Sequence, residues 1–184
     1  MRADAARRRQ AIVREARHLF AAHGSDIALE SVAEAAGVGI ATLYRNFDSR
    51  AALVDEVVLT ILRDMQQAAT EALDSIAASP ETAWAAYVQR LVELDLGALS
   101  EALGEFVADE MSGVVRREQE RTLTGVEDLL DAARTAELVR PDLTALEFVL
   151  LIGMVTRPQP EPIRAAAPDL VPRLISIVLA GMRP

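Results

Sequence analysis

Apolar residues recur at helical spacing along almost the whole chain, and this periodicity constrains the fold more than any other feature. Near the N-terminus, Ile12, Val13, Ala16, Leu19 and Phe20 share one face of a helix. Runs with the alternating pattern of a strand are nearly absent. Since 51% of the 184 residues are hydrophobic, the chain can form a substantial core. The sequence therefore predicts an all-α fold.

About nine helices are expected, separated by glycine, proline and capping residues. Their ranges are about 5–23, 29–36, 40–47, 50–77, 81–99, 101–110, 113–136, 143–156 and 170–182. Residues 157–168 hold four prolines and cannot form one helix. We expect two parts, a three-helix domain at 1–48 and a helical domain at 49–184. No glycine or proline interrupts the helix that joins them, so it is expected to be a continuous rod.

The net charge of −9 is distributed unevenly along the chain. Residues 1–50 hold eight arginines and six acids, a net charge of +2, and the remaining residues carry −11. There is no lysine, so every residue counted as a cation at pH 7 is an arginine, whose planar guanidinium binds phosphate and guanine well. A basic N-terminal part on an acidic body is typical of a protein that contacts DNA at one end.

Several classes of protein are excluded by what the sequence lacks. There is no cysteine, which excludes disulfides, zinc fingers and thiol catalysis. The longest apolar run, Phe148 to Val155, has eight residues, whereas a membrane span needs about 20. The sequence shows no phosphate-binding loop, nucleophile elbow, dinucleotide fingerprint or metal motif, and we expect no signal peptide. We expect a cytoplasmic protein that is not an enzyme and has no catalytic residue, cofactor, metal or membrane partner.

Residues 29–47, LESVAEAAGVGIATLYRNF, have the pattern of a helix-turn-helix. Gly37 provides the left-handed conformation that the turn requires, and Val38 fills the angle between the helices. The inward residues of the second helix are Ile40, Leu43 and Phe47. Its outward residues are Thr42, Arg45 and Asn46, with Tyr44 at the edge. This short, polar outward set favours recognition in the major groove of DNA.

The same stretch resembles the signature of the tetracycline-repressor (TetR) family. The matching residues are Val32-Ala33, Ala36-Gly37-Val38, Thr42-Leu43-Tyr44-Arg45, Phe47, Arg50 and Leu53. With the first helix included, the resemblance covers about fifty residues, and it is specific because spacing and residue types agree throughout. Three positions depart from the family pattern. Gly39 stands where members often have a Ser or Thr that caps the helix and contacts phosphate, and Ala28 stands where a Thr often contacts phosphate. Ile40 replaces a residue that is commonly polar.

The resemblance implies a ligand-responsive, sequence-specific DNA-binding regulator. We expect a homodimeric repressor that binds an inverted-repeat, double-stranded operator and is released by a small-molecule effector. The expected DNA-binding residues are Arg7, Arg8, Arg9, Gly39, Ile40, Ala41, Thr42, Tyr44, Arg45, Asn46 and Arg50. The alternative for the three arginines of the first helix is a solvated helix start without a DNA contact.

Two further sets of residues are expected in the C-terminal part. The candidate ligand pocket comprises Met65, Trp84, Tyr87, Leu91, Phe106, Leu123, Phe148 and Ile152, and the alternative for its aromatic residues is ordinary core packing. The candidate dimer interface is a four-helix arrangement formed by the last two helices of each subunit. Its residues are Leu146, Leu150, Gly153, Met154, Leu174, Ile175, Val178 and Met182.

Two other functions are compatible with a helical chain of this composition. One is an enzyme or carrier that binds an apolar small molecule without DNA. The other is an adaptor that uses its helices only for protein contacts. The exposed polar residues Thr42, Tyr44 and Arg45 distinguish these functions from a DNA-binding regulator, because neither alternative requires a polar recognition helix after the turn at Gly37.

Overall fold

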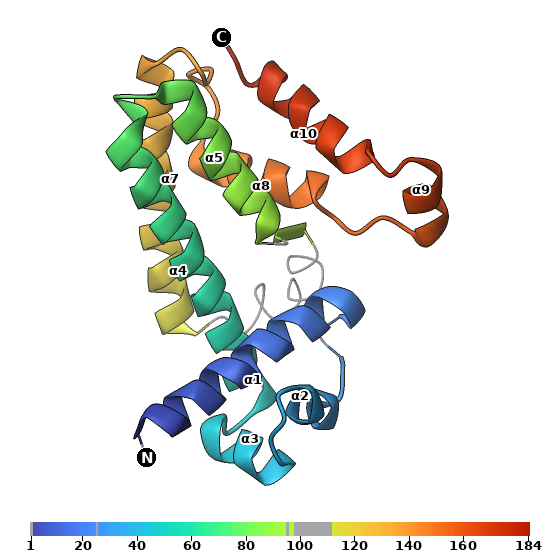
Figure 1. Ribbon diagram of the computed structural model, residues 1–184. Helices are drawn as coiled ribbons and strands as arrows, with labels where there is room; N and C mark the ends of the chain where they lie inside the picture. The colour runs from blue at the N-terminus through green and yellow to red at the C-terminus, as the bar shows by residue number, and fades with distance from the viewer. Residues whose placement is uncertain (1, 25, 95, 98–111) are drawn as a thin grey trace. The chain divides into compact units, whose positions relative to one another are not determined.

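The computed structural model describes residues 2–24, 26–94, 96–97 and 112–184, and in these ranges it contains helices and no strand (Figure 1). The helices are α1 (Arg2–His23), α2 (Leu29–Ala35), α3 (Ile40–Asn46), α4 (Arg50–Ile76), α5 (Pro80–Glu93), α7 (Gly113–Thr135), α8 (Ala145–Val155), α9 (Glu161–Ala166) and α10 (Leu170–Gly181). The expected all-α fold is confirmed. The helix expected at 101–110 lies outside the described residues.

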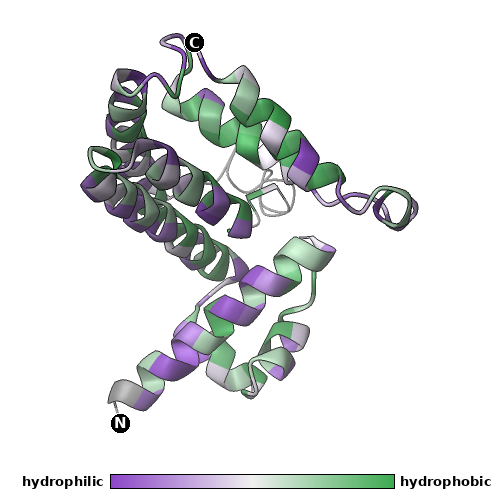
Figure 2. Ribbon diagram, turned by 45° about the horizontal axis from the view of Figure 1, so that its top comes forward, coloured by the Kyte–Doolittle hydropathy of each residue, from purple (hydrophilic) through white to green (hydrophobic). Residues whose placement is uncertain are grey.

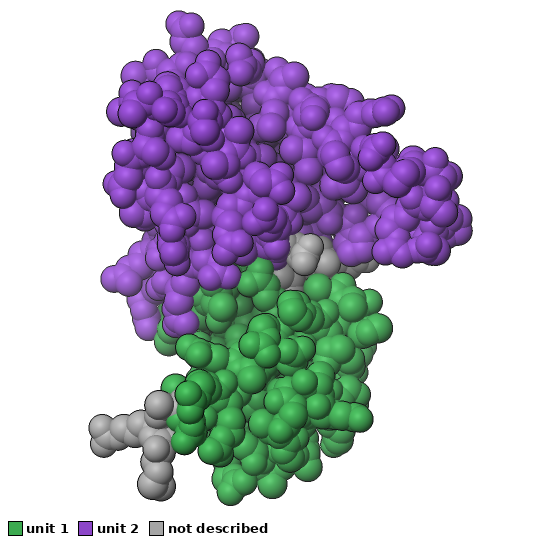
Figure 3. All heavy atoms as spheres, in the orientation of Figure 1, with its two compact units in different colours: residues 1–61, 98–116 green, residues 62–97, 117–184 purple. Residues whose placement is uncertain are grey.

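The chain forms two compact units, shown in different colours in Figure 3. One comprises residues 1–61 and 98–116, and the other comprises residues 62–97 and 117–184. Packing assigns the first turns of α4 to the first unit, where Leu53 and Val57 are fully buried. The expected functional boundary at 48/49 precedes this helix and stays a prediction.

The first unit is held together by the apolar face of α1, which packs on α2 and α3. Ile12, Ala16 and Phe20 of α1 are fully buried, as are Val32 of α2 and Leu43 of α3. Figure 2 shows hydrophilic and hydrophobic positions side by side along α1, as expected for a helix with one buried face. The predicted apolar stripe thus forms the core that supports α2 and α3.

The helix α9 is a difference from the sequence prediction. Residues 157–168 do not form one helix, as expected, but Glu161–Ala166 form a short one within them. Pro160 stands at the N-cap and Pro162 in the first turn. Backbone N–H groups at these positions have no partner inside a helix, so proline removes no helical hydrogen bond there.

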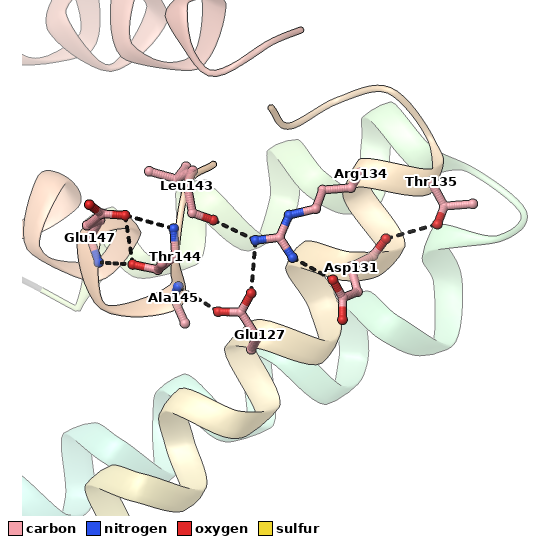
Figure 4. Close-up of polar contacts among 8 residues, drawn as sticks. All are labelled: Glu127, Asp131, Arg134, Thr135, Leu143, Thr144, Ala145 and Glu147. Carbon is pink, nitrogen blue, oxygen red and sulfur yellow. Dashed lines mark hydrogen bonds and ion pairs between the residues drawn. The ribbon is translucent and has the colours of Figure 1, made fainter. Parts of the chain in front are cut away.

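In the second unit, polar contacts of Arg134 connect the end of α7 to the start of α8 (Figure 4). Its guanidinium donates to the Leu143 carbonyl at 2.6 Å and pairs with Glu127 at 2.9 Å. The other carboxylate oxygen of Glu127 accepts the Ala145 N–H at 2.8 Å. Thr144 and Glu147 complete a capping box at the N-terminus of α8. These contacts fix where α8 begins.

The other end of α8 packs directly on Gly97. A Cβ atom at Gly97 would lie 2.3 Å from the Arg157 backbone nitrogen and 2.4 Å from the Gly153 carbonyl oxygen. The Gly97 N–H also donates to Oγ1 of Thr156 at 3.1 Å. Because the neighbours are backbone atoms, only glycine fits at this position. Both ends of α8 are therefore fixed within the second unit.

Candidate nucleic-acid interface

The turn between α2 and α3 has the hydrogen-bonding pattern of a Schellman motif. The Val38 N–H donates to the Ala33 carbonyl at 2.9 Å, and the Gly37 N–H donates to the Glu34 carbonyl at 3.0 Å. Gly37 has a φ of +66°, the left-handed conformation predicted for it. Ala33 is buried and Val38 is half-buried. The turn therefore sets the angle between the two helices through its backbone.

Two buried side chains anchor α3 and leave one of its faces exposed. Leu43 and Phe47 are buried, and Ile40 is half-buried. The residues expected to bind DNA differ in exposure: Gly39, Ala41, Tyr44 and Arg45 are exposed, and Thr42 and Asn46 are half-buried. Tyr44 is 48% exposed although it is a large aromatic residue. The outward face of α3 thus presents a phenol, a guanidinium and a hydroxyl group.

Arg45 lies along the surface of its own helix. Its Nε donates to the Ala41 carbonyl at 3.1 Å, and its terminal nitrogen donates to Oγ1 of Thr42 at 2.9 Å. Both contacts are exposed, so water competes with them and they contribute little to stability. Asn46 donates from Nδ2 to the Thr42 carbonyl at 2.8 Å. The Arg45 guanidinium can therefore exchange its local contacts for an external acceptor at small cost.

The N-termini of α2 and α3 have no side-chain cap. Ala28 and Gly39 are the N-cap residues, and neither makes a side-chain hydrogen bond to its helix. At both positions the sequence departs from the family pattern. Backbone N–H groups in the first turn of each helix are left without a side-chain acceptor at the cap.

The other four arginines expected to bind DNA, all outside α3, lie in different surroundings. Arg7 and Arg8 are exposed, and Arg7 pairs with Asp4 on the same helix. Arg9 is half-buried and contacts α3 and α4 through its guanidinium. Arg50 donates to the Ile27 carbonyl at 2.7 Å. Only Arg7 and Arg8 are therefore displayed on the surface in the way a phosphate-binding arm requires.

The described residues that were expected to line a ligand pocket lie in the second unit. Met65, Trp84, Tyr87, Leu91, Phe148 and Ile152 are buried, Leu123 is half-buried, and Phe106 lies outside the described residues. The rings of Trp84 and Tyr87 lie 5.2 and 5.9 Å from that of Phe148, measured between centroids. The Tyr87 hydroxyl is buried and has no hydrogen-bond partner among the residues that the structure describes. Its burial raises the pKa of the phenol.

The residues expected at the dimer interface are only partly exposed. Leu146, Leu150 and Met154 are exposed on α8, and Leu174, Ile175 and Val178 are half-buried on α10. Gly153 and Met182 are buried instead, a difference from the expected exposed strip. Gly153 lies against Gly97, and the Met182 carbonyl accepts the Arg140 N–H at 2.7 Å. Ile177 was not expected at the interface, but it is 62% exposed. It lies three residues after Leu174 and therefore on the same side of α10.

A groove of about 620 Å³ runs beside these residues in the second unit. Leu150 and Met154 of α8 and Val178 of α10 lie along it, and Arg140, Asp142 and Glu147 also line it. Figure 2 shows α10 as a mostly hydrophobic helix. Apolar residues of two neighbouring helices therefore face solvent around one groove.

Two family models match the chain. Residues 12–57 match the model for bacterial regulatory proteins of the tetR family. Residues 79–184, more than half of the chain, match the model for the C-terminal domain of SbtR-like transcriptional regulators. This chain belongs to the TetR family. The resemblance seen in the helix-turn-helix sequence is thereby confirmed, and members of the family are DNA-binding regulators rather than enzymes.

Solved structures of TetR regulators are similar to this chain over nearly its whole length. A TetR transcriptional regulator from Streptomyces coelicolor is 28% identical, with 96% of this chain and 98% of that chain covered and a TM-score of 0.65. One from Mycobacterium vanbaalenii is 27% identical, with 100% and 99% covered and a TM-score of 0.63. LfrR from Mycobacterium smegmatis, solved with proflavine, shares the fold at 21% identity, 97% coverage of each chain and a TM-score of 0.68. No curated protein matches the chain.

Neither a metal-binding cluster nor a membrane-spanning helix occurs in the part of the chain that the structure describes. No group of three or more His, Asp or Glu side chains is arranged there to hold a metal ion. None of the described helices combines the length and the apolar character that crossing a membrane requires.

Proposed function

We propose that this TetR-family chain is a ligand-responsive transcriptional repressor that binds an inverted-repeat operator as a homodimer. The observation that carries the proposal is the outward face of α3. Tyr44 and Arg45 are exposed there while Leu43 and Phe47 fix the helix from behind. A supported helix with exposed hydrogen-bonding side chains matches the chemistry of base edges in the major groove.

The proposed contacts divide into base contacts and phosphate contacts. Arg45 and Thr42 on the outward face of α3 are proposed to read base edges, because the hydrogen bond between them is exposed and can be exchanged for contacts with DNA. Tyr44, Arg7 and Arg8 are proposed to bind the phosphate backbone, which fixes the orientation of a protein on DNA. Since neither Ala28 nor Gly39 has a hydroxyl group to offer to phosphate, these side chains carry a larger share of the affinity.

Homodimer formation is proposed through α8 and α10. Leu150 and Met154 are 54% and 69% exposed, which is costly for such side chains in a monomer in water. Their groove lies between two helices of one unit, and a second copy with the same surface covers it in a two-fold arrangement. A two-fold dimer presents two recognition helices and therefore selects a symmetric operator.

The effector is proposed to bind in the second unit near Trp84, Tyr87 and Phe148. Three aromatic rings packed together favour a largely apolar ligand. The Tyr87 hydroxyl, which has no hydrogen-bond partner among the described residues, offers one hydrogen bond to it. The solved structure of LfrR with proflavine supports a small-molecule ligand for a chain of this fold. We propose that ligand binding releases the operator. α4 and α7 each contribute residues to both units, and we propose α4 as the helix through which the ligand acts.

A mobility-shift assay with DNA from upstream of the chain's own coding sequence, at stated salt, tests the DNA-binding role. The proposal predicts a specific complex with the wild type and binding weaker by about tenfold for Arg45→Ala, the loss of roughly one base contact. Arg14→Ala is the matched control, because Arg14 is an exposed arginine of α1 paired with Glu15. Equal affinity for the two variants would contradict the assignment of α3 as the recognition helix.

A further inference from the structure

The guanidinium of Arg9 contacts three groups that lie on two other helices of the first unit. One terminal nitrogen donates to the Asn46 carbonyl of α3 at 2.8 Å. The other pairs with the Glu56 carboxylate of α4. The guanidinium carbon also lies 4.2 Å from the centroid of the Phe47 ring. A planar fork that forms two hydrogen bonds and stacks on an aromatic ring uses the features in which arginine differs from lysine.

The contact with α3 is made at the end of that helix. Asn46 is its last residue and Phe47 its C-cap, with a buried ring. The last carbonyls of a helix have no helical partner and carry partial negative charge, so a cation stabilises them. Since α3 has only seven residues, a contact at one end affects the orientation of the whole helix.

Arg8 precedes Arg9 in the chain but lies in different surroundings. The side chain of Arg8 is exposed, whereas Arg9 is half-buried with 40% of its side chain exposed. Glu56, its partner, is 22% exposed. The two arginines therefore have different environments even though they are adjacent, and they provide a matched comparison within α1.

From this arrangement we propose that Arg9 is a positioning residue, which holds the C-terminal end of α3 on α4 through Glu56 and does not itself bind DNA phosphate. The inference rests on the proposed DNA-binding role of α3. It separates Arg9 from Arg7 and Arg8, with which it was grouped from sequence, and assigns Glu56, an acid, a favourable role in DNA binding.

Whether Glu56→Gln raises or lowers the affinity for DNA distinguishes a positioning role of Arg9 from a purely electrostatic effect. Removing an acid from a DNA-binding unit lowers its repulsion of phosphate, so electrostatics alone predicts tighter binding. If Glu56 instead holds Arg9 in place, Glu56→Gln should weaken DNA binding, because the C-terminal end of α3 is no longer fixed on α4. Asp55→Asn is the matched control, since it removes the same charge one residue away on α4.

Arg9→Lys separates the two roles in a second way. Lysine keeps the positive charge that a phosphate contact needs but cannot form two hydrogen bonds in one plane and stack on Phe47. If Arg9 is a positioning residue, Arg9→Lys should weaken DNA binding. If Arg9 contacts phosphate, the Arg9→Lys variant should bind DNA almost as tightly as the wild type.

The experiment measures the affinity of the full chain for a duplex that the wild type selects from a randomised DNA pool, over a range of salt concentrations. We expect Arg9→Lys and Glu56→Gln to bind about tenfold more weakly, with the salt slope unchanged, and Asp55→Asn to bind at least as tightly as the wild type. Arg8→Ala should reduce the steepness of the plot of log affinity against log salt concentration by about 0.9, the value for one phosphate contact. Wild-type affinity for Arg9→Lys, or tighter binding by Glu56→Gln, would overturn the proposal.

A second measurement does not depend on DNA. The Phe47 N–H donates to the Leu43 carbonyl at 2.9 Å at the end of α3, and its hydrogen exchange can be followed by NMR. Exchange should be faster in Arg9→Lys and Glu56→Gln than in the wild type and Asp55→Asn. Unchanged exchange in both variants would overturn the positioning role. Failure of the wild type to select any DNA would count instead against the proposed function, and exchange would still test Arg9.

Discussion

At the scale of single residues, Gly97 lies too close to backbone atoms to accept a side chain without rearrangement. A Cβ atom there would lie within 2.4 Å of backbone atoms of α8 and of the residues after it, and backbone cannot move aside as a flexible side chain can. We expect Gly97→Ala to lower the free energy of unfolding by about 1–3 kcal/mol, the usual cost of overpacking. Urea unfolding followed by the fluorescence of Trp84, the one tryptophan, measures this.

Gly125 provides the matched control for Gly97→Ala. It lies inside α7, and a Cβ atom built on it meets nothing within 4 Å. Gly125→Ala should therefore raise the free energy of unfolding by about 0.5–1 kcal/mol, because alanine is the better helix former. If the two alanine variants changed stability in the same direction, the close contact at Gly97 would be refuted.

Tyr87 is predicted to make stability fall at alkaline pH. Burial raises the pKa of its phenol in the folded chain, so the unfolded chain releases this proton first. The stability from the neutral phenol is present below the ordinary pKa of about 10 and is lost as pH rises beyond it. Tyr87→Phe should flatten the pH dependence of unfolding between about pH 9 and 11. An unchanged pH profile in this variant would contradict the buried, unpaired position of the hydroxyl.

At the scale of elements, the helices and their ends were largely predictable from local signals. The residues around Gly37 and Ser49 mark helix boundaries, and the Ser49 hydroxyl accepts the Ala52 N–H at 3.1 Å at the start of α4. The short helix α9 was missed because prolines usually end helices. At Pro160 and Pro162 they begin one, and that distinction depends on position within the element rather than on residue type.

The missing cap of α2 leads to a prediction for that element. Ala28 has extended backbone angles suited to an N-cap, but alanine offers no side-chain acceptor. Ala28→Ser should raise the free energy of unfolding of the first unit by about 1 kcal/mol, because serine can accept an N–H of the first turn. Thermal unfolding monitored by circular dichroism measures the gain. Ala35→Ser, at the last residue of α2, is the control, and an equal gain there would argue against capping.

At the scale of the whole molecule, sequence predicted the family, the fold and the outward face of α3, because these follow from local spacing. It could not predict that Arg9 turns inward, since Glu56 is far away in the chain and only the folded unit brings them together. The same holds for Gly153, whose burial depends on Gly97. Helical periodicity identifies an apolar face but not its partner.

Dimer formation through α8 and α10 is tested by placing charge on their exposed residues. The double variant Leu150→Glu and Met154→Glu should be monomeric at micromolar concentration, because a dimer would bury four added carboxylates. Val114→Glu, at an equally exposed apolar residue of α7, should leave the dimer intact. Sedimentation velocity distinguishes the two states. A wild type that sediments as a monomer would refute the proposed interface.

Whether α3 reads a symmetric operator can be measured by selecting duplexes from a randomised DNA pool with the full chain and sequencing them. We expect a two-fold symmetric motif whose half-sites are about one helical turn apart, 34–36 Å, or a multiple of it. Arg45→Ala should relax the preference at the same position of both half-sites. Contradiction would come from a wild type that enriches no motif, or from an Arg45→Ala variant that enriches the wild-type motif equally well.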